Sequence, residues 1–122
     1  MTGRELTLCW TEAAHYSDAD AYVSDLALSS IWGDDPDAEV PASRLDDLRQ
    51  IYAAARASVR EMRQAAGLTQ AQLAQRFGIP KRTIENWEAT GDNARTCPDY
   101  IRRMMAELLG LLPSVEDDAD DR

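Results

Sequence analysis

The stretch GLTQAQLAQRFGIPKRTIENWE, Gly67–Glu88, restricts the fold more than any other part of the chain. Thr69 is a favourable N-cap for the segment QAQLAQRF, because its hydroxyl can accept a hydrogen bond from a free amide of the first turn. Gly78 suits a tight turn, and Pro80 suits the first turn of a new helix that continues to about Ala89. The stretch therefore predicts two short helices joined by a turn.

The second predicted helix has two chemically different sides. At about 100° per residue, the apolar side carries Pro80, Ile84 and Trp87. This side can pack against Leu73, Ala74 and Phe77 of the preceding helix. The polar side carries Lys81, Arg82, Glu85, Asn86 and Ala89. Arginine and lysine suit guanine edges and asparagine suits adenine, so the polar side is typical of base recognition. Any surface helix also has two such sides, and only the helix-turn-helix spacing favours DNA binding.

Charge is distributed unevenly along a chain whose net charge is −9. Residues 56–105 carry nine basic and five acidic side chains, a net charge of +4, whereas residues 1–55 carry −8 and residues 106–122 carry −5. Phosphates respond to charges within a Debye length of about 10 Å, so a basic face on an acidic chain can still bind DNA. A mixed, solvated helical surface agrees equally well with the charges alone.

The segment RQAAGLTQAQLAQRFGIPKRTIENWE, Arg63–Glu88, resembles the lambda-repressor-like helix-turn-helix family of phage Cro and repressor proteins, also called the xenobiotic-response-element family. The matching positions are Arg63, Gly67-Leu68-Thr69-Gln70, Leu73-Ala74, Gly78-Ile79, Thr83-Ile84 and Glu88. The resemblance covers about residues 56–112. It implies a five-helix core that presents its third helix to the major groove. A closing helix would begin at Pro98 and pack through Ile101, Met104, Met105, Leu108 and Leu112.

The resemblance also implies roles for individual side chains. Those at the base-reading positions are Lys81, Arg82 and Asn86. Backbone or supporting contacts to DNA are expected from Gln70, Thr83 and Arg95. Arg63 and Glu88 match an internal ion pair that ties the first helix of the five-helix core to the recognition helix. The chain departs from the family pattern at Pro80, where a serine or threonine cap is common, and in the long, acidic loop Ala89–Cys97.

The remainder of the chain is also predicted to be helical, with a short helix over about Arg4–Ala14 and another over Ser17–Gly33. Residues Asp34–Ser43 contain two prolines and read as a loop. Apolar residues then recur every three or four positions, which predicts one helix from about Arg44 to Ala66 with a core-facing stripe: Leu45, Leu48, Tyr52, Ala55, Val59, Met62 and Ala66. We expect Tyr22, Leu26 and Trp32 to cover the first half of this stripe. The alternative is that the stripe pairs with a second chain.

Three segments follow from these patterns: an acidic N-terminal helical extension (1–42), a helix-turn-helix DNA-binding core (43–112) and an acidic, disordered tail (113–122). No motif orders catalytic residues, so we expect no enzymatic activity and no cofactor. One histidine, His15, and two distant cysteines, Cys9 and Cys97, are too few for a structural metal site. The cysteines are expected to be reduced, in a cytoplasmic chain without a membrane span.

The sequence thus predicts an all-α, sequence-specific regulator of transcription that binds double-stranded DNA. The expected form is a small repressor that binds an inverted-repeat operator as a homodimer. The alternative is an antitoxin-like or adaptor module of a mobile element, in which DNA binding is secondary and the acidic N-terminal half binds a protein partner. The sequence does not identify the operator, the dimer face or any effector.

Overall fold

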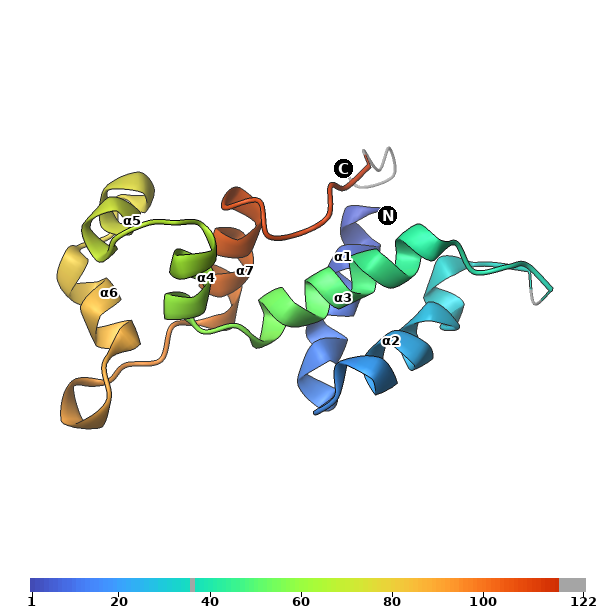
Figure 1. Cartoon of the computed structure of the whole chain (residues 1–122), viewed down its shortest axis with the longest axis horizontal. Helices are drawn as coiled ribbons and strands as arrows, with labels where there is room; N and C mark the ends of the chain where they lie inside the picture. Colours follow the sequence, from blue (N-terminus) through green and yellow to red (C-terminus); the bar gives the residue numbers. More distant parts are fainter. Residues whose placement is uncertain (36, 117–122) are drawn as a thin grey trace. The chain divides into compact units, whose positions relative to one another are not determined.

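The computed structural model describes residues 1–35 and 37–116, and this part of the chain is helical (Figure 1). Its seven α-helices are α1 (Gly3–Glu12), α2 (Ala19–Ala27), α3 (Ala42–Arg56), α4 (Val59–Ala65), α5 (Gln70–Phe77), α6 (Lys81–Glu88) and α7 (Asp99–Leu108). Three short 3-10 helices are η1 (Ala13–His15), η2 (Ser30–Trp32) and η3 (Gly91–Asn93). The described residues contain no strand beyond one isolated bridge between Thr2 and Glu116. The prediction of an all-α fold is confirmed.

The chain divides into two compact units. Among the described residues, unit 1 comprises residues 1–35, 37–56 and 112–116, and unit 2 comprises Ala57–Leu111. This division differs from the core of residues 43–112 expected from the sequence. Unit 2 holds four α-helices and η3, so the helix-turn-helix unit has one α-helix fewer than the resemblance implies.

The continuous helix expected from Arg44 to Ala66 is wrong, because α3 ends at Arg56 and α4 begins at Val59. Ser58 has an extended backbone (φ −75°, ψ 166°) and acts as the N-cap of α4. Its hydroxyl accepts a hydrogen bond from the Glu61 amide at 3.1 Å, and the Glu61 carboxylate accepts one from the Ser58 amide at 3.0 Å. This capping box satisfies the first amides of a new helix and so stabilises the break.

In unit 1, α1 and α2 pack against α3 (Figure 1). The core side chains with no exposed surface include Leu6, Tyr22, Leu48 and Ile51. The Tyr22 hydroxyl donates to the Cys9 carbonyl at 2.7 Å, and the Tyr22 ring lies 4.9 Å from that of Tyr52. Residues before α3 therefore cover the first part of its apolar stripe within the same chain. Leu45, which was expected in the stripe, is exposed instead.

The helix expected over Ser17–Gly33 consists of two pieces, α2 and η2. Asp18, and not Ser17, caps α2 by accepting a hydrogen bond from the Asp20 amide. Trp32 lies on η2, where its indole N–H donates to the Leu26 carbonyl at 2.7 Å. The same carbonyl accepts from the Ser29 amide at 3.1 Å, so both bonds stabilise the turn at the end of α2.

The chain after α7 returns to the N-terminus within unit 1. The Glu116 amide donates to the Met1 carbonyl at 2.9 Å, and the Glu116 carboxylate lies 3.6 Å from the N-terminal ammonium. Residues 113–116, predicted as the start of a disordered tail, are therefore held in place. The rest of that predicted tail, residues 117–122, lies outside the described residues.

Pro98 is the N-cap of α7 in unit 2, as the sequence predicts. Met105 and Ala106 are buried, but Met104 and Leu108 are 48% and 63% exposed, so their assignment to the packing face is wrong. On a helix, Tyr100, Met104 and Leu108 lie on one side, because they are spaced by four residues. Among the described residues, none of the helices combines the length and the apolar character needed to cross a membrane.

Candidate nucleic-acid interface

The first helix of the motif, α5, begins at a capping box. The Thr69 hydroxyl accepts from the Gln72 amide at 3.1 Å, and the Gln72 side-chain oxygen accepts from the Thr69 amide at 2.9 Å. At the other end, Gly78 adopts the left-handed conformation (φ +65°), which L-residues with a side chain rarely adopt. The amides of Gly78 and Ile79 both donate to the Ala74 carbonyl. These contacts place a tight turn directly after Phe77.

Pro80 is the N-cap of α6, and its carbonyl accepts from the Thr83 amide at 2.9 Å. Its side chain is exposed, so its assignment to the inner side of the helix is wrong. Ile84 is the buried residue of α6, and Leu73 of α5 is also buried. Because α6 packs on both α5 and α4, its axis is fixed within unit 2.

The polar side of α6 is free of side-chain interactions. Lys81, Arg82 and Glu85 are exposed, and Asn86 is half-buried. Within the described residues, the side chains of Lys81, Arg82 and Asn86 form no hydrogen bond or ion pair. Their donors are therefore available to a ligand, and a carboxylate, that of Glu85, lies among them.

Glu88 at the end of α6 is the centre of a polar cluster. Its carboxylate accepts two hydrogen bonds from Arg63 of α4, from Nε and from Nη2, each at 2.8 Å. The remaining Arg63 nitrogen, Nη1, donates to the Leu68 carbonyl at 3.0 Å. The Glu88 side chain is 1% exposed and that of Arg63 is 15% exposed. This two-bond pair joins α4 to α6, with the geometry that guanidinium and carboxylate groups favour.

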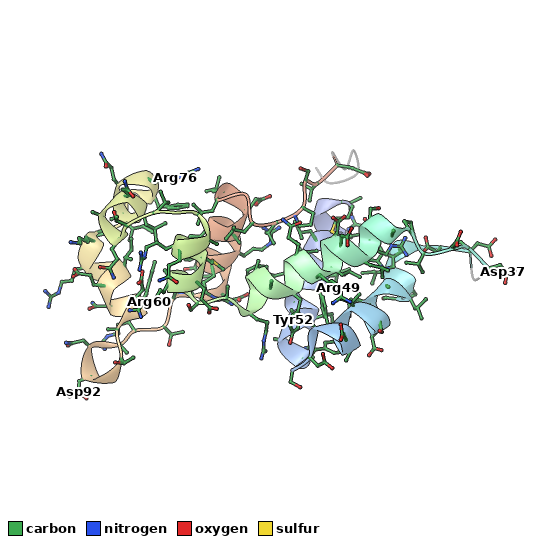
Figure 2. All side chains as sticks on the ribbon, viewed as in Figure 1. Asp37, Arg49, Tyr52, Arg60, Arg76 and Asp92 are labelled. Atoms are coloured by element: carbon green, nitrogen blue, oxygen red, sulfur yellow. The ribbon has the colours of Figure 1, made fainter. Side chains whose placement is uncertain are left out.

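Two further residues act on Glu88, and the sequence pattern did not predict this role for either. Arg60 lies one turn before Arg63 on α4 and is labelled in Figure 2; its Nε donates to Glu88 Oε1 at 3.2 Å. The Gln70 side chain also lowers the pKa of Glu88. The sequence contained one indication of the Arg60 contact: Arg60 and Arg63 are three residues apart and so lie on the same side of one helix.

These contacts set the protonation of the cluster. Hydrogen bonds from Arg63, with a smaller contribution from Arg60, hold the pKa of Glu88 below its ordinary value of 4.5, although burial acts in the opposite direction. The same bond to Glu88 raises the pKa of Arg63. Both groups are therefore charged at neutral pH, and Glu88 cannot serve as an exposed acid beside DNA.

The residues assigned to supporting contacts are spread over three elements. Gln70 is at the start of α5 and Thr83 is half-buried in α6. Arg95 lies after η3, where its guanidinium donates to the carbonyls of Asp92 and Ala94 at 3.2 and 2.8 Å. Its amide donates to the Asn86 carbonyl at 2.9 Å, so this loop is tied to the end of α6.

The charge of unit 2 favours anions on its exposed surface. Residues 57–111 carry eight basic and six acidic side chains. The buried Glu88 side chain is paired with Arg60 and Arg63, and the other exposed cations of the motif and its loop are Arg76, Lys81, Arg82 and Arg95. Arg76, labelled in Figure 2, also donates to the Leu108 carbonyl at 3.3 Å. Exposed cations beside a protruding helix suit a phosphate backbone.

Comparison with known families supports the same motif. The helix-turn-helix family model matches residues 59–92, which run from α4 through α6 to the start of η3. Searches of curated proteins and of solved structures each gave no match. Residues 59–92 are therefore similar to a lambda repressor/Cro-like helix-turn-helix domain.

Proposed function

We propose that the protein is a sequence-specific transcriptional regulator, and that it acts as a small repressor on an inverted-repeat operator. The observation that carries this proposal is the polar side of α6. Lys81, Arg82 and Asn86 present donors without side-chain partners, on a helix held from behind by α4 and α5. A rigid helix with free, exposed donors is what direct reading of base edges requires.

The spacing of Arg82 and Asn86 fits two base pairs that are about two steps apart. The four-residue separation corresponds to a rise of about 6 Å along α6, against about 3.4 Å per base pair in DNA. Arg82 can donate two hydrogen bonds to one guanine, and Asn86 can bind one adenine through its amide. Lys81, at the start of α6, adds a cation that suits either guanine or a phosphate.

Contacts to the DNA backbone are proposed for Gln70, Thr83 and Arg95. Gln70 lies at the start of α5, where free helix amides favour a phosphate. Arg95 is exposed and close to the end of α6, so it can reach the adjacent strand. Such contacts set the orientation of α6 without carrying sequence information.

The exposed side of α7 supports a homodimer. Tyr100, Met104 and Leu108 are 67%, 48% and 63% exposed, and large apolar side chains in a row are characteristic of a protein interface. The ten residues of α7 span about 15 Å. An interface of this length is small, so we expect a weak dimer that forms mainly on a two-half-site operator.

Selection of bound sequences from a random pool of DNA duplexes tests the proposal. We expect enrichment of a palindrome whose half-sites are about one helical turn apart, as a symmetric dimer requires. Enrichment of a single half-site would remove the dimer from the proposal, and no enrichment would overturn sequence-specific reading. A reporter gene with the selected site placed over its promoter then distinguishes repression from activation.

A further inference from the structure

A second surface with the character of a binding site lies in unit 1, outside the helix-turn-helix motif. It is a groove of about 290 Å³ between α1, α2 and η2. Leu26 and Ile31 contribute apolar surface to it, and Leu8 contributes a side wall that is 42% exposed. The volume is enough for one or two apolar side chains, and the groove is open to solvent along Leu8.

The polar groups beside the apolar surface are acidic. Glu12 and Asp25 line the groove, and both are exposed. The Tyr16 hydroxyl donates to Asp25 Oδ2 at 3.0 Å, which raises the pKa of Tyr16 and keeps its proton on the ring oxygen. No arginine or lysine lines the groove, and neither Glu12 nor Asp25 forms an ion pair with a described residue.

The surroundings strengthen this preference for cations. The described residues of unit 1 carry four arginines and twelve carboxylates, a side-chain charge of −8. Two of the arginines are already paired, Arg44 with Asp34 and Arg49 with Asp20. A nucleic acid is repelled by such a surface, whereas a basic segment of a protein is attracted to it.

The groove is open to solvent, and this favours a macromolecular ligand over a small molecule. Pockets for small molecules usually enclose most of the ligand surface. Here the Leu8 wall and both carboxylates face solvent, which suits a side chain presented by a larger molecule. A helix with apolar anchors on one side and lysine or arginine around them matches both the apolar surface and the acidic edge.

We propose that the groove between α1, α2 and η2 binds an apolar side chain from a basic, amphipathic helix of a partner protein. Glu12 and Asp25 bind the cations that flank this anchor. The site lies in unit 1 and uses none of the residues of α6, so it is independent of the proposed DNA-binding function.

The test uses the full chain and a fluorescent synthetic helix as the probe. The probe has about 15 residues, with leucine at positions i, i+4 and i+7 and with lysine and alanine elsewhere. Fluorescence anisotropy should show saturable binding. A probe in which alanine replaces each leucine should bind at least about tenfold more weakly, because only the apolar anchors are lost. A probe with glutamate in place of lysine should not bind.

Two exposed leucines provide matched variants of the protein. Leu8→Ser should weaken binding of the leucine probe about tenfold. Leu28→Ser should leave it unchanged, because Leu28 is 78% exposed and does not line the groove. A double variant, Glu12→Gln with Asp25→Asn, changes only exposed charges and retains an oxygen for the Tyr16 hydroxyl. It should weaken binding about fivefold.

Equal affinities of the Leu8→Ser and Leu28→Ser variants would overturn the proposed groove. So would equal affinities of the leucine and alanine probes, which would mean that charge alone attracts the helix. Absence of saturable binding by the parent chain would overturn the proposal as a whole.

Discussion

Replacing Arg63 with methionine should destabilise unit 2 more than any other single charge removal on α4. The change removes two hydrogen bonds to Glu88 and one to the Leu68 carbonyl. It leaves a carboxylate whose side chain is only 1% exposed without its main partner. Methionine retains an apolar stem, so the loss comes mainly from the charge and its hydrogen bonds.

The expected magnitude follows from the burial of the pair. Breaking a buried ion pair from one side costs about 3–5 kcal/mol. We expect the lower end, about 3 kcal/mol, because Arg60 still donates a hydrogen bond to Glu88. This corresponds to a fall of about 12–24 °C in Tm for a unit of this size. The Arg60 side chain is 56% exposed, and Arg60→Met should cost only about 0.5 kcal/mol.

Thermal unfolding followed by circular dichroism measures both variants against the parent chain. The double variant Arg63→Met with Glu88→Met should recover part of the lost stability, because no buried charge remains. Equal, small shifts for Arg63→Met and Arg60→Met would refute the buried pair. A double variant no more stable than Arg63→Met would show that the stranded carboxylate is not the cause.

Three other perturbations have defined outcomes. The pKa of Glu88 is lowered from 4.5 in the folded chain, so ionised Glu88 stabilises the fold above pH 4.5, and this stabilisation is lost as pH falls through the folded pKa. In thermal melts between about pH 5 and pH 3, the Glu88→Gln variant should therefore lose less stability than the parent chain. The Cys9 thiol, buried and with a pKa raised to about 11, should react with a disulfide reagent only on unfolding, and rapid labelling of the native chain would contradict its burial. A chain starting at Pro41 exposes Leu48 and Ile51 and should aggregate or lose the α3 helix, whereas an equally stable, monodisperse product in sedimentation would show that α1 and α2 do not cover α3.

Local signals in the sequence were sufficient to predict the two helices and the turn of the helix-turn-helix. The cap at Thr69, the turn at Gly78 and the new helix after Pro80 all lie within a few residues of the bonds that they form. The Arg63–Glu88 pair was implied by family resemblance, and the contact of Arg60 with the same carboxylate was not. Long side chains on one face of a helix can share a distant partner, and spacing alone does not identify it.

The break between α3 and α4 shows what hydrophobic periodicity cannot determine. Ala55, Val59 and Met62 are all buried and continue the predicted stripe across the break. Periodicity shows which side chains are apolar, but it does not reveal that the helix is interrupted at Ala57 and Ser58. The Ser58–Glu61 capping signature was present in the sequence and outweighed the stripe.

The exposed side of α7 has a related explanation. Met104 and Leu108 continue the apolar spacing of the helix, and the sequence analysis assigned them to the core. Periodicity identifies an apolar face, but not whether this chain or another molecule covers it. The same reasoning applies to the groove in unit 1, since the pattern predicted that Leu26 is buried and contained no signal for the open space beside it.

The most direct test of base reading by α6 compares the affinities of Arg82→Ala and Asn86→Ala for the selected site and for random duplex at one salt concentration. Each variant should lose about 1–3 kcal/mol on the selected site and little on random DNA. Arg95→Ala, the matched control, should weaken both duplexes alike. Parent-like affinity of the Arg82 and Asn86 variants for the selected site, or equal losses on both duplexes, would contradict base recognition by α6.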